Sequence, residues 1–120
     1  MTALKKKSET CEGKLRRMCK DIAEEITNGF EDKPNKSYTY SAFFVCLHKW
    51  MEGVYDIEWI THQDHSYKAA RLLVAGGGPN IWVNLQTNTV DGYWGTDKVH
   101  WSFVDNIGLD DYLEELHASK

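Results

Sequence analysis

The sequence predicts an α+β fold of two layers, in which an antiparallel meander sheet of four or five strands packs on two N-terminal helices and one C-terminal helix. Three observations lead to this prediction. Apolar residues recur at helical spacing near both ends of the chain, and they alternate with polar residues between residues 54 and 103. The breaks between alternating segments are short enough for hairpins, which favours antiparallel pairing. No repeat or linker divides the 120 residues, so a single domain over 1–120 is expected.

The first helix is predicted from one apolar stripe at spacings of three and four residues. The stripe consists of Cys11, Leu15, Met18, Ile22 and Ile26. Ser8 or Thr10 provides the side chain that caps the start, and Asn28-Gly29 is a typical stop. The segment 31–36 is a polar loop in which Pro34 prevents continuation of the helix.

A second helix is expected over 41–51, although Tyr38-Thr39-Tyr40 just before it has the composition of a strand. The helical interpretation rests on four apolar side chains that share one helical face. These are Phe43, Leu47, Trp50 and Met51. Gly53 is the expected end of this helix.

Alternation of apolar and polar residues predicts strands over 54–61, 67–75, 80–87 and 90–94, with 99–103 as a possible fifth. The turn between the first two strands is the polar segment 62–66, and the next is the glycine-rich break Gly76-Gly77-Gly78-Pro79. The final helix places an apolar face inward and four carboxylates outward. The inward residues are Leu109, Tyr112, Leu113 and Leu116, and the outward residues are Asp110, Asp111, Glu114 and Glu115.

Charge divides the chain into a basic arm and an acidic body. Residues 1–20 carry seven basic and two acidic side chains, a balance of +5, and the remaining residues carry seven basic and sixteen acidic ones, a balance of -9. An acidic body disfavours direct nucleic-acid binding, which depends on neutralising phosphates. It favours a basic protein surface as partner. The plainer alternative is that the charge serves solubility alone.

The sequence indicates no cofactor, metal site or membrane span. Cys11, Cys19 and Cys46 form an odd set without CxxC spacing, which we interpret as free thiols in a reducing cytoplasm. His62 and His65 are only two metal ligands, and they lie in a polar turn. The triple glycine leads into a strand and not into a helix, so it does not match a nucleotide-binding loop. No apolar run is long enough to cross a bilayer.

Trp82 is the leading candidate for a partner-binding anchor. It alternates with Asn80, Asn84 and Gln86 on the face opposite Ile81, so it is expected among amides on a solvated sheet face. Aromatic side chains packed as core under helices are the alternative. The full set of predicted partner-binding residues is Asn80, Trp82, Tyr93, Trp94, Asp97, Asp105, Asp110, Asp111, Glu114 and Glu115.

Catalysis is the less favoured interpretation. Asp97 and His100 form the best candidate acid-base pair, but catalysis requires them within hydrogen-bond distance and beside a pocket. A small enzyme that modifies a nucleotide or a protein through Asp97 and His100 therefore stays an alternative. A DNA-linked regulator that uses the basic arm at residues 5–20 is a second alternative.

Residues 76–97 read GGGPNIWVNLQTNTVDGYWGTD and precede an acidic helix. This pattern resembles a group of small, uncharacterised proteins of phages and mobile elements, in which a Gly-Gly-Pro-Asn turn, a strand and Gly-Tyr-Trp-Gly recur. The resemblance covers about residues 72–116. It implies a protein of the bacterial host cytoplasm that inhibits a defence system, as anti-CRISPR proteins do. We therefore expect a non-enzymatic inhibitor that binds a host defence protein or ribonucleoprotein, with a CRISPR effector as the suspected target, and competes with nucleic acid. An exposed aromatic sheet face could instead pair two copies in a homodimer.

Overall fold

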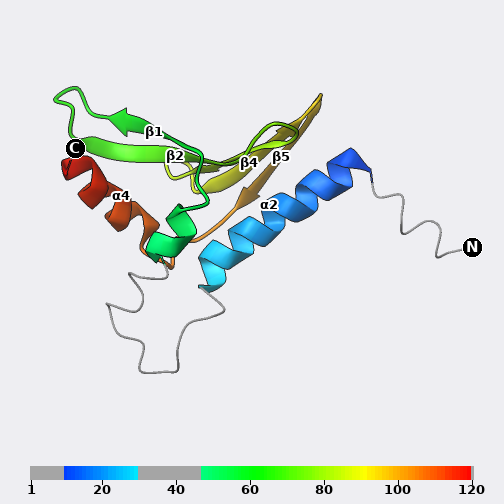
Figure 1. The fold of residues 1–120 in the computed structure, drawn as a ribbon, viewed down its shortest axis with the longest axis horizontal. Helices are drawn as coiled ribbons and strands as arrows, with labels where there is room; N and C mark the ends of the chain where they lie inside the picture. Colours follow the sequence, from blue (N-terminus) through cyan, green and yellow to red (C-terminus); the bar gives the residue numbers. More distant parts are fainter. Residues whose placement is uncertain (1–9, 30–46, 120) are drawn as a thin grey trace, which may run out of the picture.

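A computed structural model describes residues 10–29 and 47–119 and confirms the α+β fold. In chain order the elements are α2 (Cys11–Asn28), a helical segment at 47–51, β1 (Asp56–Thr61), β2 (Tyr67–Ala75), β3 (Asn80–Asn84), β4 (Thr89–Trp94), β5 (Asp97–Ser102) and α4 (Leu109–Ala118). Figure 1 shows the sheet above the helices. All neighbouring strands are antiparallel, and their order β1-β2-β3-β4-β5 is that of a meander with the fifth strand present.

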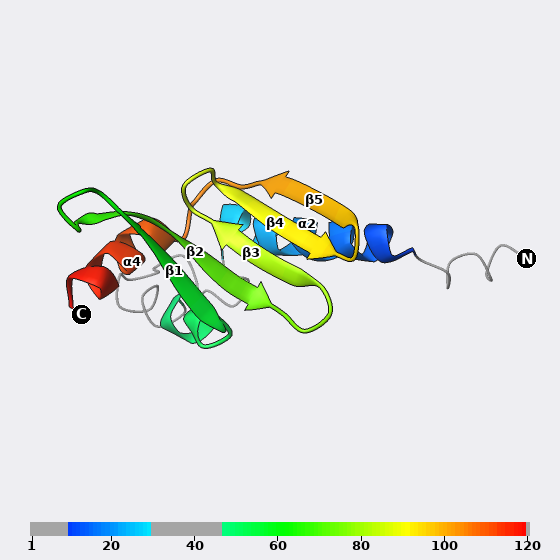
Figure 2. The ribbon, with the colours of Figure 1, turned by 90° about the horizontal axis from the view of Figure 1, so that it is seen from above.

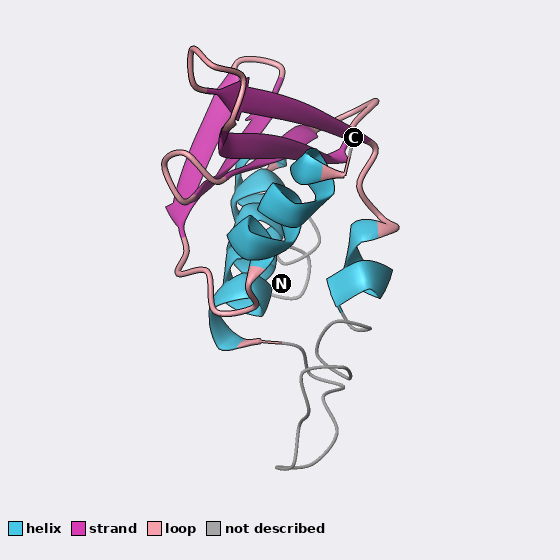
Figure 3. Cartoon of the chain, turned by 90° about the vertical axis from the view of Figure 1, so that its left-hand side faces the viewer, coloured by secondary structure: helices cyan, strands magenta, loops and turns pink. Residues whose placement is uncertain are grey.

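The two main helices lie against the same face of the sheet. α2 contacts β4 and β5, whereas α4 contacts β2 (Figures 2 and 3). The segment 47–51 joins them, because Trp50 donates to Glu25 of α2 and His48 shares a hydrogen bond with Tyr112 of α4. No described helix covers the opposite side of the sheet, which we call the open face.

α2 begins and ends as predicted, but its buried face is rotated. The Thr10 hydroxyl accepts a hydrogen bond from the Gly13 N–H at 3.0 Å, and Gly29 ends the helix at a φ of 89°. The fully buried residues are Leu15, Cys19, Ala23 and Ile26. Met18 and Ile22 of the predicted stripe are only partly buried, and the side chain of Cys11 lies outside the described part. The small residues at 19 and 23 let the helix lie close to the sheet.

Gly92 marks the point of closest approach between α2 and β4. A Cβ atom at this position would stand 2.5 Å from the Cys19 Sγ and 2.8 Å from the Leu15 Cδ1. Such separations are well inside van der Waals contact, so the absence of a side chain is what allows this packing. The core continues along the same face through Leu72, Val83 and other residues. Its members include Ile81, Val90, Val99, Ile107, Leu109 and Leu113, all at most 2% exposed.

The strands differ from their predicted bounds where side chains form turns. The strand expected over 80–87 ends at Asn84, because the Asn84 Oδ1 accepts hydrogen bonds from the backbone of Gln86 and Thr87. Asn88 then adopts a φ of 57° to complete the turn into β4.

α4 turns a different side toward the sheet than predicted at its C-terminal end. Leu109 and Leu113 are buried, but Leu116 is 38% exposed. His117 takes the inward position, with its ring 5.2 Å from that of Trp59 and 6.0 Å from that of Tyr67. A bulge in the β1–β2 pairing near residue 68 brings Tyr67 to the same side of the sheet as Trp59. The C-terminal end of α4 therefore contacts the sheet through His117, whose ring packs against Trp59 and Tyr67. The expected membership of Phe43 in the core lies outside the described residues.

Candidate functional site

The open face is polar, with one large aromatic side chain near its middle. Cross-strand partners share a face, so the pairings of Trp82 with Leu73 on β2 and Asp91 on β4 define it. Its central residues are Asp56, Glu58, Arg71, Leu73, Asn80, Trp82, Asn84, Thr89, Asp91, Tyr93, Lys98, His100 and Ser102. Trp82 is half-buried and points away from the core residues Ile81 and Val83. Its predicted place on the face opposite Ile81 is therefore observed.

Arg71 is a neighbour of Trp82 that the sequence analysis missed. Its guanidinium lies 4.3 Å from the centroid of the Trp82 ring, within cation–π distance. Arg71 also forms an ion pair with Glu58 of β1. The arginine precedes the segment that carries the aromatic pattern, and only the β2–β3 register brings it to Trp82. This contact holds a positive charge against the face of the indole on the open face.

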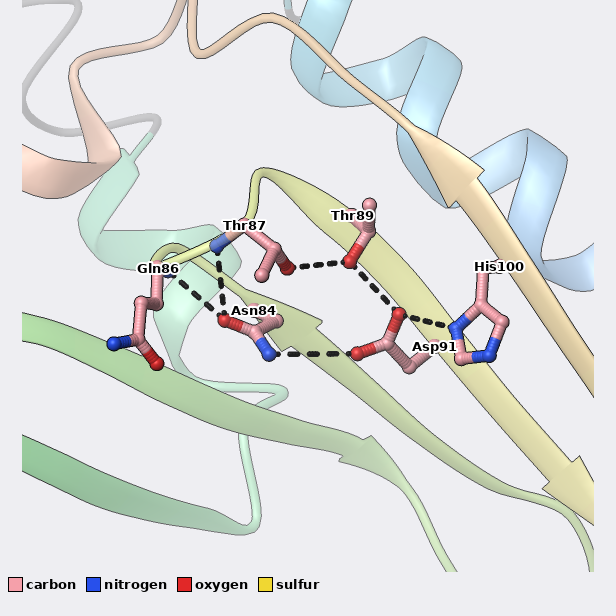
Figure 4. A network of polar contacts seen from close by, with 6 residues as sticks. All are labelled: Asn84, Gln86, Thr87, Thr89, Asp91 and His100. Carbon is pink, nitrogen blue, oxygen red and sulfur yellow. Dashed lines mark hydrogen bonds and ion pairs between the residues drawn. The ribbon is translucent and has the colours of Figure 1, made fainter.

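A polar network is centred on Asp91 (Figure 4). Asp91 is the cross-strand partner of Trp82, so the network and the indole are neighbours on the open face. The Asp91 Oδ1 lies 2.8 Å from the His100 Nδ1 and accepts a hydrogen bond of 2.8 Å from the Thr89 hydroxyl. Its Oδ2 has a longer contact of 3.5 Å with the Asn84 amide. Asp91 is only 6% exposed, which makes it the one charged residue buried within the described part of the chain. These partners compensate its loss of hydration.

The candidate acid-base pair of Asp97 and His100, on which the catalytic alternative depends, does not form. The two residues are three positions apart on β5, so they lie on opposite faces of the sheet. Asp97 pairs with Trp94 on the face toward α2, while His100 pairs with Asp91 on the open face. The observed acid-histidine pair therefore comes from two strands, which only the β4–β5 register could reveal.

The three aromatic residues predicted to anchor a partner also lie on two different faces of the sheet. Tyr93 lies on the open face, with its ring 6.1 Å from that of His100 in an edge-on arrangement. Trp94 lies on the helix side, where the Lys14 ammonium is 5.9 Å from its ring. Trp82 and Tyr93 therefore share a surface, with Asn80 beside Tyr93 in the cross-strand register, and Trp94 does not belong to it.

Two of the predicted acidic contacts have intramolecular partners. Asp105 caps α4, because its two carboxylate oxygens accept the N–H groups of Leu109 and Asp110, each at 2.9 Å. Asp110 accepts a hydrogen bond of 2.7 Å from the Tyr67 hydroxyl. Burial and this hydrogen bond raise the pKa of Tyr67 far above its ordinary range.

Asp111, Glu114 and Glu115 are the exposed carboxylates of α4. Because α4 packs on the other side of the sheet, they lie across the sheet from Trp82. The predicted residues therefore form two surfaces and not one.

The described chain is electrically asymmetric. Residues 47–119 carry eleven acidic and four basic side chains, a balance of -7. At one end, β1 contributes Asp56 and Glu58 to the open face and α4 contributes its exposed carboxylates to the other side. The opposite end holds the basic residues of α2. Two of those are engaged within the fold, since Lys14 lies against Trp94 and Lys20 lies 5.9 Å from the Trp101 ring.

Neither a metal centre nor a reactive thiol emerges from the described residues. They contain no group of three or more His, Cys, Asp or Glu side chains placed to hold a metal ion. Burial raises the pKa of the Cys19 thiol to about 11, with Asp91 adding to the effect, so this thiol keeps its proton near neutral pH. Cys46 lies outside the described part. None of the described helices is both long and apolar enough to cross a membrane.

The chain has no significant match to a protein-family model, to a curated protein or to a solved structure.

Proposed function

We propose that this chain is a non-enzymatic inhibitor that inserts its acidic end into a positively charged cleft of a nucleic-acid-handling protein. The acidic end consists of Asp56 and Glu58 on the open face together with Asp111, Glu114 and Glu115 on the opposite side. The observation that carries the proposal is that one end of the molecule presents exposed carboxylates on both of its faces. A flat basic patch could meet only one face, whereas a cleft meets both.

Trp82 supports the same proposal as an apolar anchor. It is half-buried on an uncovered sheet face, and Arg71 and Glu58 link it to the acidic end. Aromatic side chains held in one orientation lose little entropy on binding and often dominate the energetics of an interface. Tyr93 extends this apolar contact toward β5.

The class of partner follows from the charge. Clefts that hold a nucleic-acid backbone are lined by lysine and arginine, and an acidic protein end competes for those side chains. Together with the resemblance to phage and mobile-element proteins, this favours a bacterial defence protein or ribonucleoprotein, with a CRISPR effector as the first target to test. The proposal needs no direct contact between this chain and nucleic acid.

The experiment is an affinity pull-down from a bacterial lysate, followed by measurement of the purified partner's affinity at low and high salt. The test variant is Asp111→Lys with Glu115→Lys, and the matched control is Asp21→Lys with Glu24→Lys on α2. We expect the test variant alone to lose at least tenfold in affinity, and salt to weaken the wild-type complex because exposed charges are screened beyond about 8–10 Å. Trp82→Ala should weaken binding at every salt concentration. Equal losses in test and control variants, or a complex that nucleic acid does not displace, would contradict the proposal.

A second candidate function is favoured by the contact between Asp91 and His100. A buried carboxylate that accepts from Nδ1 fixes the tautomer of the imidazole and leaves its Nε2 to act as a general base. The His100 side chain is 56% exposed, so a substrate could approach it. This candidate predicts turnover by catalytic amounts of protein and its loss in His100→Gln. The inhibitor predicts stoichiometric action that His100→Gln leaves in place.

A further inference from the structure

Within the described residues, the sheet ends in two edge strands whose open faces differ in charge, acidic on β1 and basic on β5. Among the described residues, β1 and β5 each pair with one neighbouring strand, and they form the two margins of the sheet in Figure 2. An edge strand exposes unpaired backbone N–H and C=O groups, which can accept a further strand. Natural proteins often place charges on such edges to control what pairs with them.

β1 and β5 carry complementary side chains on both of their faces. On the open face, β1 presents Asp56 and Glu58, whereas β5 presents Lys98 and His100. On the helix side, β1 presents Ile57 and Trp59, whereas β5 presents Val99 and Trp101.

We propose that the β5 edge of one copy of this chain pairs with the β1 edge of a second copy, so that the sheet continues from one molecule into the next. In a five-stranded antiparallel meander the first and last strands run in the same direction. A second copy in the same orientation therefore places its β1 parallel to β5, with the open faces and the helix sides continuous.

One register matches the side chains at four successive positions and leaves Ile60 beside the hydroxyl of Ser102. If Asp56 lies beside Lys98, the alternation of both strands fixes all the other neighbours. The resulting pairs are Asp56 with Lys98, Ile57 with Val99, Glu58 with His100, and Trp59 with Trp101. Asp56 and Lys98 are then opposite in sign, Glu58 lies beside a ring that can donate a hydrogen bond to it, and the apolar neighbours are aliphatic or aromatic. Cross-strand pairs of both kinds stabilise a sheet.

Charge also disfavours the two symmetric alternatives. A β1–β1 contact would bring Asp56 and Glu58 close to their own copies, and a β5–β5 contact would do the same with Lys98. The expected assembly is therefore head-to-tail and open-ended, and not a closed dimer.

The test is sedimentation velocity of the full chain under reducing conditions, from micromolar to near-millimolar concentration. The wild type should sediment faster as its concentration rises. Asp56→Lys and Lys98→Glu should each abolish that increase, because each brings like charges together at the contact. Gln86→Lys, a charge change in the exposed turn between β3 and β4 and away from both edges, should behave as the wild type does. Circular dichroism and the thermal midpoint establish that each variant is folded.

An equimolar mixture of the two variants decides the geometry. The Asp56→Lys chain keeps an intact β5 edge, and the Lys98→Glu chain keeps an intact β1 edge. The mixture should therefore regain open-ended association, because Asp56 meets Lys98 at one contact and the introduced lysine meets the introduced glutamate, again opposite in sign, at the next. A wild type that stays monomeric at every concentration, variants that still associate alone, or a mixture that stays monomeric would overturn the proposal.

Discussion

Asp91 and His100 face each other across β4 and β5, and 2.8 Å separates the Asp91 Oδ1 from the His100 Nδ1. The two side chains differ in solvent exposure, because the Asp91 carboxylate is almost fully buried while the His100 imidazole is largely exposed. The buried partner determines where the exposed ring points. This relationship makes the open face a preorganised surface, whichever of the two candidate functions it serves.

The burial of Asp91 predicts an unequal response to mutation. Asp91→Ala removes the acceptor that Thr89, Asn84 and His100 share, so the variant should lose about 1–3 kcal/mol of unfolding free energy. His100→Ala removes an exposed ring and should cost less than about 1 kcal/mol. Urea denaturation of the two variants checks this order. Equal losses would mean that the network does not hold Asp91 in place.

Gly92 provides a test of helix–sheet packing. Gly92→Ala should destabilise the fold by about 1–3 kcal/mol, because the new methyl group overlaps Cys19 and Leu15. Gly78→Ala is the matched control, since its Cβ meets nothing within 4 Å and the loss should stay below about 0.5 kcal/mol. Adding Cys19→Ala to Gly92→Ala should recover part of the loss, which a double-mutant cycle measures. Strictly additive losses would contradict the close approach.

Most of the fold was predictable because each element has a local signal. Thr10, Gly29 and the alternation of Ile81, Trp82 and Val83 specify a cap, a stop and a strand without reference to distant residues. The sheet order followed from short connections. Leu116 was misplaced because the sequence shows helical spacing but not the Trp59–Tyr67 surface that His117 meets.

The candidate site was less predictable because it depends on strand register. Trp82 was placed by alternation within one strand, whereas Arg71 and Asp91 reach it from neighbouring strands. The alternative acid-base pair of Asp97 and His100 does not form, because a spacing of three on a strand places the two side chains on opposite faces of the sheet. An acidic cluster in the sequence likewise does not reveal which carboxylates accept hydrogen bonds within the chain, as Asp105 and Asp110 do.

The cap of α4 predicts a structural role for Asp105. Asp105→Ala removes the acceptor of two backbone N–H groups at the start of the helix and should cost about 1 kcal/mol. Asp111→Ala, in the same first turn, removes only a favourable charge near the helix N-terminus and should cost about 0.5 kcal/mol or less. Thermal denaturation of both variants checks the difference. Partner binding that falls in Asp105→Ala without any loss of stability would assign this carboxylate to the interface instead.

Alkaline pH should destabilise the fold through Cys19. Its thiol has an ordinary pKa of 9.0, and burial raises the pKa to about 11 in the folded chain. Between these values the folded chain binds more protons than the unfolded chain, so the free energy of unfolding decreases as pH rises. The contribution is complete below pH 9 and is lost toward pH 11, at a rate of at most about 1.4 kcal/mol per pH unit.

Comparison of the wild type with Cys19→Ala isolates this contribution from other groups that titrate in the same range. Urea denaturation at pH 7, 9 and 10 should show a shallower decline for Cys19→Ala than for the wild type. Tyr67→Phe should leave the slope between pH 9 and 10 nearly unchanged, because the Tyr67 contribution persists up to the ordinary tyrosine pKa of 10.0 and declines only above it. Parallel declines in the wild type and Cys19→Ala would show that the thiol is not sealed between α2 and Gly92.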